Sequence, residues 1–437
     1  MAPTRKKTAD IHNHPRRIAT KATKPRDKDA SDFDVLIVGG GLSGGTMAAL
    51  LGTQGFKVAC IDREIPVTQL EEEFDGRTTA ISWGSQKVMQ GAGVWPDLKK
   101  NTCPIRTIDI LDGNSPVLLR FGAEEVGNQS FGWIIENRLI RKALFDRMQG
   151  LKNVTHVAPA QIVSLDRDDS AVRATLKDGR RFSAPLVIGA DGRNSFTREW
   201  AGIGTRGWMY EQRAVICTVT HERPHNNVAV EHFRDQGPFA TLPMTPDKDG
   251  RHRSSVVWTE HCADKDSALH YPKDVFDAAL TARFPDNYGR VRQTGGRFSY
   301  PLGLQHAHTY IAPRVALIAE AAHGIHPIAG QGLNMGFRDV AALCECLVAA
   351  RDAGTDLGDD TMLETYQRQR RFDNMAMAGA TDGLNRLFSN NITPLPGLRK
   401  VGLRMVARIP VAKKFFMHQA MGAAGLLPDL IREAKSS

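Results

Sequence analysis

The feature that most constrains this chain is a glycine-rich turn between a buried strand and a helix. Residues 35–38, Val-Leu-Ile-Val, form a continuous apolar run of the kind found in buried parallel strands. Gly39, Gly41 and Gly44 follow at the G-x-G-x-x-G spacing of a dinucleotide-binding turn. The first glycine permits the tight turn, the second lets backbone N–H groups approach a pyrophosphate, and the third lets the helix pack close to the strand. The turn therefore predicts a β-α-β unit that binds a dinucleotide at a helix N-terminus.

The second strand of this unit ends in a carboxylate. A helix over 44–54 precedes a strand over 57–61, and Asp62 lies about 20 residues past the glycines, where it would accept hydrogen bonds from adenosine ribose hydroxyls. Residues 41–45 also match G-x-S-x-G, the nucleophile elbow of serine hydrolases, with Ser43 as the nucleophile. The acid that ends the second strand favours the dinucleotide interpretation. A hydrolase would instead require an Asp or Glu followed by a His further along the chain, at positions typical of the hydrolase fold.

Charge is concentrated at the N-terminal end. Of the net charge of +9, residues 1–30 supply +6, from nine Lys or Arg against three Asp. We expect residues 1–31 to form a disordered basic tail, because they are polar and lack apolar periodicity. The tail has no apolar region of a secretory signal, and a transit peptide is a lesser alternative, opposed by Asp10, Asp27 and Asp29. Nucleic-acid binding is not expected, because no aromatic residue accompanies the charges.

Cysteine and histidine spacing indicates neither disulfides nor a metal. The six cysteines show no C-x-x-C pair, so reduced thiols in a cytosolic setting are expected. The spacing of His323 and His326 matches no usual zinc motif, and no facial triad is evident. No apolar run reaches the roughly 18 to 20 residues of a membrane-spanning helix, so any membrane contact is expected to be peripheral.

Apolar periodicity predicts the remaining elements. They are a helix containing Ile81, Val88 and Met89, an antiparallel pair within 106–131, a helix over 133–148, strands over 162–165 and 186–188 with a hairpin at Asp178-Gly179 between them, a mainly antiparallel sheet over 206–295 with strands at 214–219, 228–233 and 255–259, and a buried strand over 315–319.

Three separated segments carry a resemblance to a known fold. They are the glycine-rich turn with Asp62, the turn 189–192 (Gly-Ala-Asp-Gly), and residues 320–339 after the last buried strand. Together they resemble the para-hydroxybenzoate hydroxylase fold of single-component FAD monooxygenases over residues 32 to about 370. Residues 136–138, 326–334 and 381–389 are in addition similar to the ring hydroxylases of ubiquinone biosynthesis.

The resemblance implies an α/β fold with a discontinuous Rossmann-like FAD-binding domain, an inserted mainly antiparallel β-sheet substrate domain and a C-terminal helical segment. The expected FAD-binding domain comprises 32–105, 132–205 and 296–370, the substrate domain 106–131 and 206–295, and the helical segment 371–437.

The resemblance also implies a reaction. FAD, reduced by NADPH or NADH, would react with O2 and hydroxylate a polyprenylated phenol via a flavin hydroperoxide. Two other enzymes on this fold, an isoprenoid reductase and a halogenase, are alternatives, although no tryptophan forms the halogenase motif W-x-W-x-I-P. A third alternative, from another class, is a catalytically weak flavin-bound assembly subunit.

Site residues follow from the matching motifs. Asp62 would hold the ribose, Arg77 would line the FAD groove, and residues 327–334 would border the isoalloxazine ring. The expected cofactor-binding residues are Gly39, Gly41, Gly44, Asp62, Arg63, Arg77, Arg138, Asp191, Gly192, Glu320, Pro327, Gly330, Gly332, Leu333 and Asn334. The expected catalytic residues are His326, Pro327 and Gln331, and for His326 a structural or hydrogen-bonding role beside the flavin is favoured over acid–base catalysis.

One position departs from the family pattern. Family members commonly have Gly-Asp where this chain has Ala319-Glu320, and that Asp usually bonds the ribityl hydroxyls. Glu320 is one methylene longer, so either the backbone shifts or the contact weakens. The helix expected from near Gly332 would direct its positive end at the charge of reduced flavin.

Residues 383–428 are basic and apolar and contain no Asp or Glu. This segment is either a helical cover with a solvated basic face or an amphipathic surface lying on anionic lipid. The second interpretation, with the resemblance, predicts a peripheral protein on the inner face of a bacterial inner membrane, or on the mitochondrial matrix side as a lesser alternative. A complex with other ubiquinone-biosynthesis proteins is a further expectation.

Overall fold

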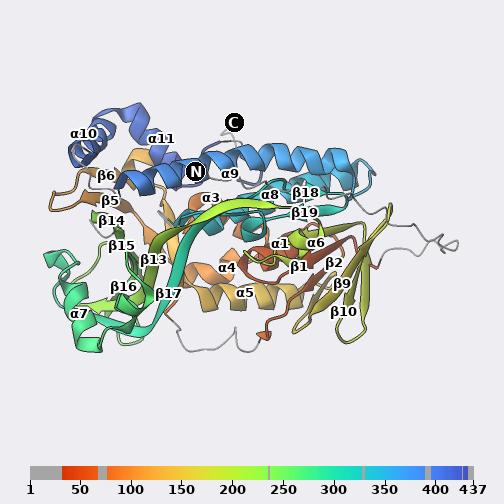
Figure 1. The fold of residues 1–437 in the computed structure, drawn as a ribbon, viewed down its shortest axis with the longest axis horizontal. Helices are drawn as coiled ribbons and strands as arrows, with labels where there is room; N and C mark the ends of the chain where they lie inside the picture. The colour runs from red at the N-terminus through yellow and green to blue at the C-terminus, as the bar shows by residue number, and fades with distance from the viewer. Residues whose placement is uncertain are drawn as a thin grey trace, which may run out of the picture.

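The computed structural model describes residues 32–66, 76–234, 237–326, 330–388, 395–425 and 427–431, with side chains from 402 onward in the C-terminal part. The expected basic tail, 1–31, and Pro327 lie outside the described residues. A parallel sheet with its helices lies on one side of the molecule and a large sheet on the other, and helix α9 runs along both (Figure 1).

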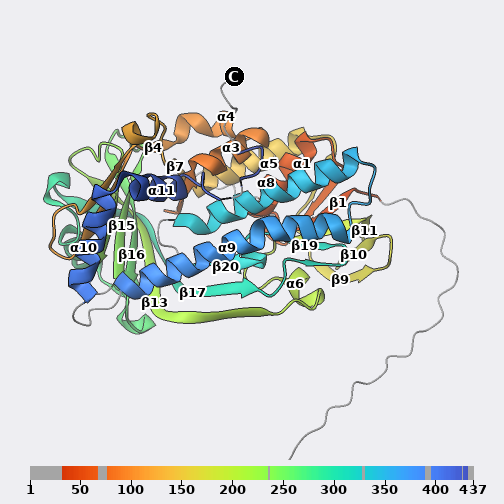
Figure 2. The same ribbon diagram turned by 90° about the horizontal axis from the view of Figure 1, so that it is seen from above.

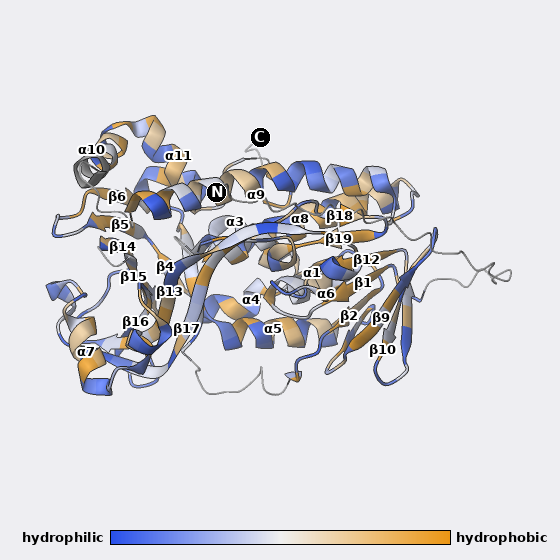
Figure 3. Cartoon of the chain, viewed as in Figure 1, coloured by the Kyte–Doolittle hydropathy of each residue, from blue (hydrophilic) through white to orange (hydrophobic). Residues whose placement is uncertain are grey.

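The β-α-β unit forms the centre of a six-stranded sheet in the order β18-β19-β12-β1-β2-β8. Its strands are β1 (Val35–Val38), β2 (Val58–Ile61), β8 (Val154–Val157), β12 (Leu186–Gly189), β18 (Ile311–Ala312) and β19 (Val315–Leu317). All pairs are parallel except β18–β19. Every residue of β1 and β2 is buried, which is why these strands are apolar without alternation (Figure 3).

Helices cover this sheet, and two small sheets flank it. The helices are α1 (Leu42–Thr53), α3 (Trp83–Gly91), α4 (Trp95–Leu98), α5 (Asn137–Gly150), α6 (Phe196–Trp200) and α8 (Gln331–Asp352). One small sheet contains β9 (Ile162–Arg167), β10 (Val172–Leu176) and β11 (Arg181–Ala184), and the other contains β3 (Thr78–Ser82), β4 (Cys103–Ile105) and β7 (Gly132–Glu136). Short 3₁₀ turns are η1 (Lys99–Asn101), η2 (Ala123–Val126), η3 (Asp264–Asp266), η4 (Ala268–His270), η5 (Asp286–Tyr288) and η6 (Ala319–Ala321).

The large sheet has eight strands in the order β20-β17-β13-β16-β15-β14-β5-β6. They are β5 (Thr107–Asp112), β6 (Leu119–Gly122), β13 (Thr205–His221), β14 (Val228–Arg234), β15 (Gly237–Met244), β16 (His252–Glu260), β17 (Val291–Ala307) and β20 (His323–Gly324). Only β14 and β5 pair in parallel. One face packs on α7 (Lys273–Thr281) through a separate apolar core that includes Val215, Trp258 and Phe276.

The opposite face of the large sheet contacts the part of the chain built around the six-stranded sheet. The Thr218 hydroxyl donates to the Gly76 carbonyl at 3.3 Å, and the Thr78 hydroxyl donates to Ser255 Oγ at 2.7 Å. Arg253 reaches Glu136, where its Nη2 lies 2.8 Å from Oε1. These contacts fix which face of the sheet looks towards the nucleotide turn.

Three helices close the C-terminal end, namely α9 (Asp360–Phe388), α10 (Leu395–Arg408) and α11 (Pro410–Ala420). Seen from above, α9 crosses from the six-stranded sheet to the large sheet, and α10 and α11 lie over the end of the large sheet (Figure 2).

Two predicted helix starts were wrong. Ile81 lies in β3, and the helix that holds Val88 and Met89 begins at Trp83, capped by the Ser82 hydroxyl. Residues 133–136 lie in strand β7, and α5 begins only at 137. In both places the chain pairs β3 with β7, so sheet hydrogen bonds override the local helical pattern. The other predicted strands and helices are present within a few residues, whereas the domain boundaries stay a prediction.

A buried ionic cluster holds α8 and α9 together. Asp339 of α8 accepts hydrogen bonds from Arg370 Nε at 2.9 Å, Asn374 Nδ2 at 3.0 Å and the Ala319 backbone at 3.0 Å, and His323 Nε2 lies 2.5 Å away. Burial alone would raise the pKa of Asp339, but His323 and Arg370 hold it well below its usual range. The carboxylate therefore stays charged and joins α8 to η6, β20 and α9.

Removing this carboxylate should destabilise the protein strongly. We expect Asp339→Ala to lower the free energy of unfolding by about 3 kcal/mol, since the loss of one partner leaves a buried Arg370 charge less compensated. Asp352→Ala is the control, because that carboxylate pairs on the surface with Arg351 and should cost less than about 1 kcal/mol. Urea unfolding of the two variants measures both effects, and equal losses would contradict the assignment.

Candidate functional site

The nucleotide turn contains two kinds of glycine. A methyl group on Gly39, whose φ is +100°, would lie 2.5 Å from the Ala190 carbonyl oxygen, and one on Gly44 would overlap the Gly39 carbonyl. A methyl group on Gly41 would meet no atom within 4 Å. The first and third glycines are thus required by the chain's own packing, whereas the second leaves space before the unpaired N–H groups of α1.

Asp62 is held at the edge of this space. Its Oδ2 accepts from the Gly40 backbone at 2.9 Å and its Oδ1 accepts from the Glu64 backbone at 3.0 Å. Each carboxylate oxygen has a second acceptor site, so the oriented side chain retains capacity for ribose hydroxyls.

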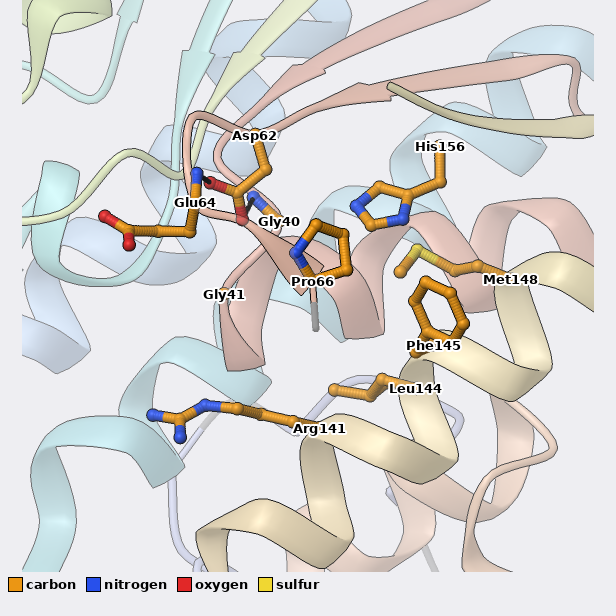
Figure 4. A pocket seen from close by; sticks show the side chains of 10 residues that line it. All are labelled: Gly40, Gly41, Asp62, Glu64, Pro66, Arg141, Leu144, Phe145, Met148 and His156. Carbon is orange, nitrogen blue, oxygen red and sulfur yellow. Dashed lines mark hydrogen bonds between the residues drawn. The ribbon is translucent and has the colours of Figure 1, made fainter. Parts of the chain in front are cut away.

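A pocket opens beside Asp62 (Figure 4). It is lined by Gly40, Gly41, Asp62, Glu64, Pro66, Arg141, Leu144, Phe145, Met148 and His156. Burial lowers the pKa of His156, with Asp62 opposing, so its imidazole is neutral near pH 7. Apolar side chains of α5 face a carboxylate across the pocket, which suits a flat heteroaromatic ring attached to a sugar.

Sequence reasoning missed the α5 and His156 side of this pocket. The apolar residues of α5 had only the helical spacing of core positions. The structure places His156 near Asp62, because β8 pairs in parallel with β2 and His156 lies opposite Cys60, two residues before Asp62. In the sequence, the histidine itself is the only sign of this position.

The turn 189–192 lies against the first glycine. Asp191 accepts hydrogen bonds from the Ser195 hydroxyl at 2.5 Å and from the Thr197 backbone at 2.9 Å. Its carboxylate therefore orders the start of α6, and its contact with a pyrophosphate stays a prediction. Gly192, with φ +80°, has open space on its Cβ side.

The N-terminus of α8 lies beside that of α1. A methyl group on Gly336 would lie 2.7 Å from the Ala319 methyl and 3.1 Å from Ser43 Oγ. Ser43 is thus packed between two helices and is 8% exposed, which does not suit a nucleophile. One turn earlier, Gly332 has no atom within 4 Å of a Cβ position. This contact brings the first turns of α1 and α8 together, and Gly41 and Gly332 each have open space on the Cβ side.

Asn334 fixes the start of α8. Its Nδ2 donates to the carbonyls of Ala80 at 3.0 Å and Gly330 at 2.8 Å, and its Oδ1 accepts from the Ser82 backbone at 2.9 Å. Gly330 has φ +63° and is the N-cap residue. The Asn334 side chain thus fixes the backbone at Ala80, Ser82 and Gly330. Gln331, at the start of the same helix, is also buried. The neighbouring Leu333 is partly buried.

His326 is a buried polar group without a partner. Its side chain has no exposed surface, and neither ring nitrogen has a hydrogen-bond partner among the described residues. The Tyr210 ring meets it edge-on at 5.3 Å, and the Tyr210 hydroxyl donates to Asp382 at 2.7 Å. Burial lowers the pKa of His326 to about 4, with Asp382 opposing. A neutral imidazole therefore has one donor and one acceptor free for a ligand.

The three predicted arginines differ in placement. Arg138 Nε donates to Glu136 at 2.8 Å, and Arg77 lies over the Phe298 ring at 5.5 Å. Arg63 is 80% exposed and lies outside the lining of the Figure 4 pocket. Its contact with the cofactor stays a prediction.

Glu320 is exposed and has no hydrogen-bond partner among the described residues. The preceding Ala319 has φ +52°, in the left-handed region that favours glycine, and its N–H donates to buried Asp339. The backbone thus keeps a conformation natural to the Gly of the family pattern, although Ala319 carries a side chain there and Glu320 is one methylene longer than Asp.

Comparison with known proteins identifies the family. A family described as FAD binding domain matches residues 32–380. Ubiquinone hydroxylase UbiL of Rhodospirillum rubrum is 46% identical over 396 residues, 91% of each chain. The 3-demethoxyubiquinol 3-hydroxylase of Escherichia coli is 34% identical over 391 residues, covering 89% of this chain and 98% of that protein. The probable FAD-dependent monooxygenase pqsL of Pseudomonas aeruginosa superimposes with a TM-score of 0.70 at 21% identity, over 85% and 99% of the chains, and shows the same fold.

Fold and site together define an FAD-dependent monooxygenase. The chain belongs to the FAD-dependent hydroxylases of ubiquinone biosynthesis. The predictions of fold class, family, FAD and monooxygenase class are confirmed. The residues fit FAD, because open glycines occur at two adjacent helix starts and a carboxylate lies at the edge of the turn. Within the described residues no group of His, Cys, Asp and Glu is arranged to hold a metal, and the six cysteines are free.

The two kinds of glycine give a direct test. Gly41→Val should fold and lose FAD, because its side chain fills space meant for the pyrophosphate. Gly44→Val should fail to fold, because its side chain overlaps backbone. Flavin absorbance and thermal unfolding of the purified proteins separate the two effects. Gly150→Val is the control, an open glycine at the end of α5. Stoichiometric FAD in Gly41→Val would contradict the placement of the turn.

Proposed function

We propose that this protein hydroxylates the ring of a polyprenylated phenol in ubiquinone biosynthesis, with O2 as co-substrate and NADPH or NADH as electron donor. The observation that carries the proposal is the pair of adjacent helix starts with open glycines, together with buried His326, which has no hydrogen-bond partner among the described residues. The relatives, which are named as hydroxylases of ubiquinone biosynthesis, support the substrate class.

Bound FAD would supply the redox chemistry, namely hydride acceptance and oxygen activation. The turn at Gly39 and Gly41 would hold its pyrophosphate, Asp62 its ribose and the Figure 4 pocket its adenine. Residues 330–334 would present backbone N–H groups and the positive end of α8 to the flavin ring, where that field stabilises negative charge. Glu320 would reach the ribityl chain.

His326 would orient the flavin or the phenol and would not transfer protons. Because its pKa is about 4, the ring is a poor proton acceptor at neutral pH, but it offers one donor and one acceptor to the flavin or the phenol. Tyr210, held by Asp382, keeps the ring in place from the side of the large sheet. Gln331 and Pro327 would complete the boundary of the reaction space.

The reaction can be tested on the holo-protein. We expect prenylphenol to accelerate NADPH or NADH oxidation and to gain one oxygen atom that derives from labelled O2, detected by mass spectrometry. Expression in strains blocked at single ring-hydroxylation steps identifies the carbon. Saturated prenyl bonds would indicate a reductase, a halogenated ring a halogenase, and oxidation unaffected by the phenol an assembly subunit.

The surface of α10 and α11 is both basic and apolar. Exposed apolar side chains are Met405, Ile409, Val411, Phe415 and Phe416, and exposed cations are Arg404, Arg408 and Lys414. None of the described helices is long and apolar enough to span a bilayer. We propose that this surface lies on anionic lipid, where each cation contributes about 1 kcal/mol and the aromatic rings enter the interface.

The structure shows which basic residues of α10 and α11 are suitable for testing this contact with lipid. Lys413 Nζ lies 2.8 Å from Glu125 Oε1 and joins α11 to η2, so it serves as an internal anchor. We expect Arg408→Glu/Lys414→Glu to abolish co-sedimentation with anionic vesicles without loss of FAD, and high salt to release the wild type. Lys142→Glu is the control, because this lysine is an exposed residue of α5, away from α10 and α11 in the sequence. Equal binding to neutral vesicles would contradict the proposal.

A further inference from the structure

Strand β14 carries a carboxyl group in apolar surroundings. Glu231 is partly exposed, and no hydrogen bond or ion pair joins it to any described residue. Burial raises its pKa to about 7. An unpartnered carboxyl among apolar side chains costs stability, so its presence needs a reason other than folding.

The sheet register shows which way Glu231 faces. It lies opposite Ala240 of β15 and Ile110 of β5, and pairs share a face of the sheet. The neighbouring pair His232–Phe239 faces the separate core under α7. Glu231 therefore belongs to the other face, the one that contacts the FAD-binding part.

Helix α9 links this face to the environment of His326. Asp382 binds Tyr210, which packs on His326, and Phe388 stacks on Phe233 at 3.7 Å between ring centroids. Asp382 and Phe388 are six residues apart, about 9 Å along a helix. Phe233 and Glu231 lie on the same face of β14, so α9, which contacts the Tyr210–His326 pair through Asp382, also contacts the face that carries Glu231 through Phe388.

We propose that Glu231 binds the phenolic hydroxyl of the substrate and takes its proton. The inference deepens the proposed function and rests on it. The phenolic O–H would donate to a Glu231 carboxylate oxygen. When the proton transfers, the phenol O–H bond breaks and an O–H bond forms on the carboxyl, which leaves a phenolate and a neutral acid with no change in oxidation state. A phenolate ring is richer in electrons and reacts more readily with an electrophilic oxygen.

The other titratable groups near this face of the sheet are Arg253, Asp382, Asp112 and Cys103. Arg253 pairs with Glu136, and Asp382 with Tyr210 and Arg386. Asp112 occupies the β5 position opposite Phe233, and Cys103 lies on β4, where burial raises its pKa to about 11. No ion pair joins any of these groups to Glu231 in the described part of the chain. The carboxyl therefore responds mainly to its apolar surroundings and to a bound ligand.

The test compares Glu231→Gln with the wild type as FAD-loaded protein, using a short-chain prenylphenol as probe. We expect FAD content to be unchanged, kcat/KM to fall at least tenfold, and the rise of kcat/KM through about pH 7 to disappear. Glu222→Gln is the control, since that carboxylate is exposed and pairs with Arg290. An unchanged kcat/KM and pH profile in Glu231→Gln would overturn the assignment.

Thermal unfolding gives a readout independent of turnover. Because the folded pKa of Glu231 is raised from 4.5 to about 7, the wild type loses stability as pH rises from about 4.5, and the loss is complete above about 7. Glu231→Gln should therefore raise Tm relative to wild type more at pH 8 than at pH 5. If the difference in Tm between the variant and the wild type is the same at both pH values, Glu231 is not buried as the proposal requires.

Phenol binding separates this proposal from the proposed function. The affinity of the wild-type protein for the phenol is measured from the change in flavin absorbance during a phenol titration. We expect this affinity to weaken as pH falls through about 7, and the measurement needs no variant. If the phenol binds in this way without being hydroxylated, the proposed function fails and the Glu231 assignment stands. If hydroxylation occurs but binding is independent of pH and of residue 231, the assignment alone fails.

Discussion

The close contact between the N-termini of α1 and α8 is the constraint on which the rest of the structure depends. Side chains at Gly44 and Gly336 would separate these helices from the turn and from each other. Their absence lets the first turns of the two helices approach each other, and the N-terminal end of each helix carries a partial positive charge. An anionic cofactor bound at these helix starts would therefore be stabilised by both dipoles.

Polar groups divide into those that the fold uses and those that it leaves free. Asp339, Asn334 and Asp191 each have several partners inside the protein and fix backbone. His326 has none among the described residues, although it is fully buried. The motif containing His326 and Asn334 therefore combines an internal brace with a group available to a ligand. Residue type alone does not separate these roles.

The sequence predicted what depends on local pattern. Residues 35–38 and 186–188 were recognised as buried strands because a strand covered on both faces is apolar throughout. Ile81 and residues 133–136 were misassigned because their strand character comes from pairing between distant segments. The Tyr210–Asp382 contact spans 172 positions and leaves no local signal. Glu231 lies within the predicted strand 228–233, but only the register of that strand shows which face of the sheet it occupies.

Helix α9 has a mechanical consequence. It is fixed to the FAD-binding part by Arg370 and to the large sheet by Phe388, with no described break between these residues. A continuous helix of this kind acts as a strut that resists bending between its two attachments. Separation of the two sheets would therefore have to break one of these attachments or bend the helix.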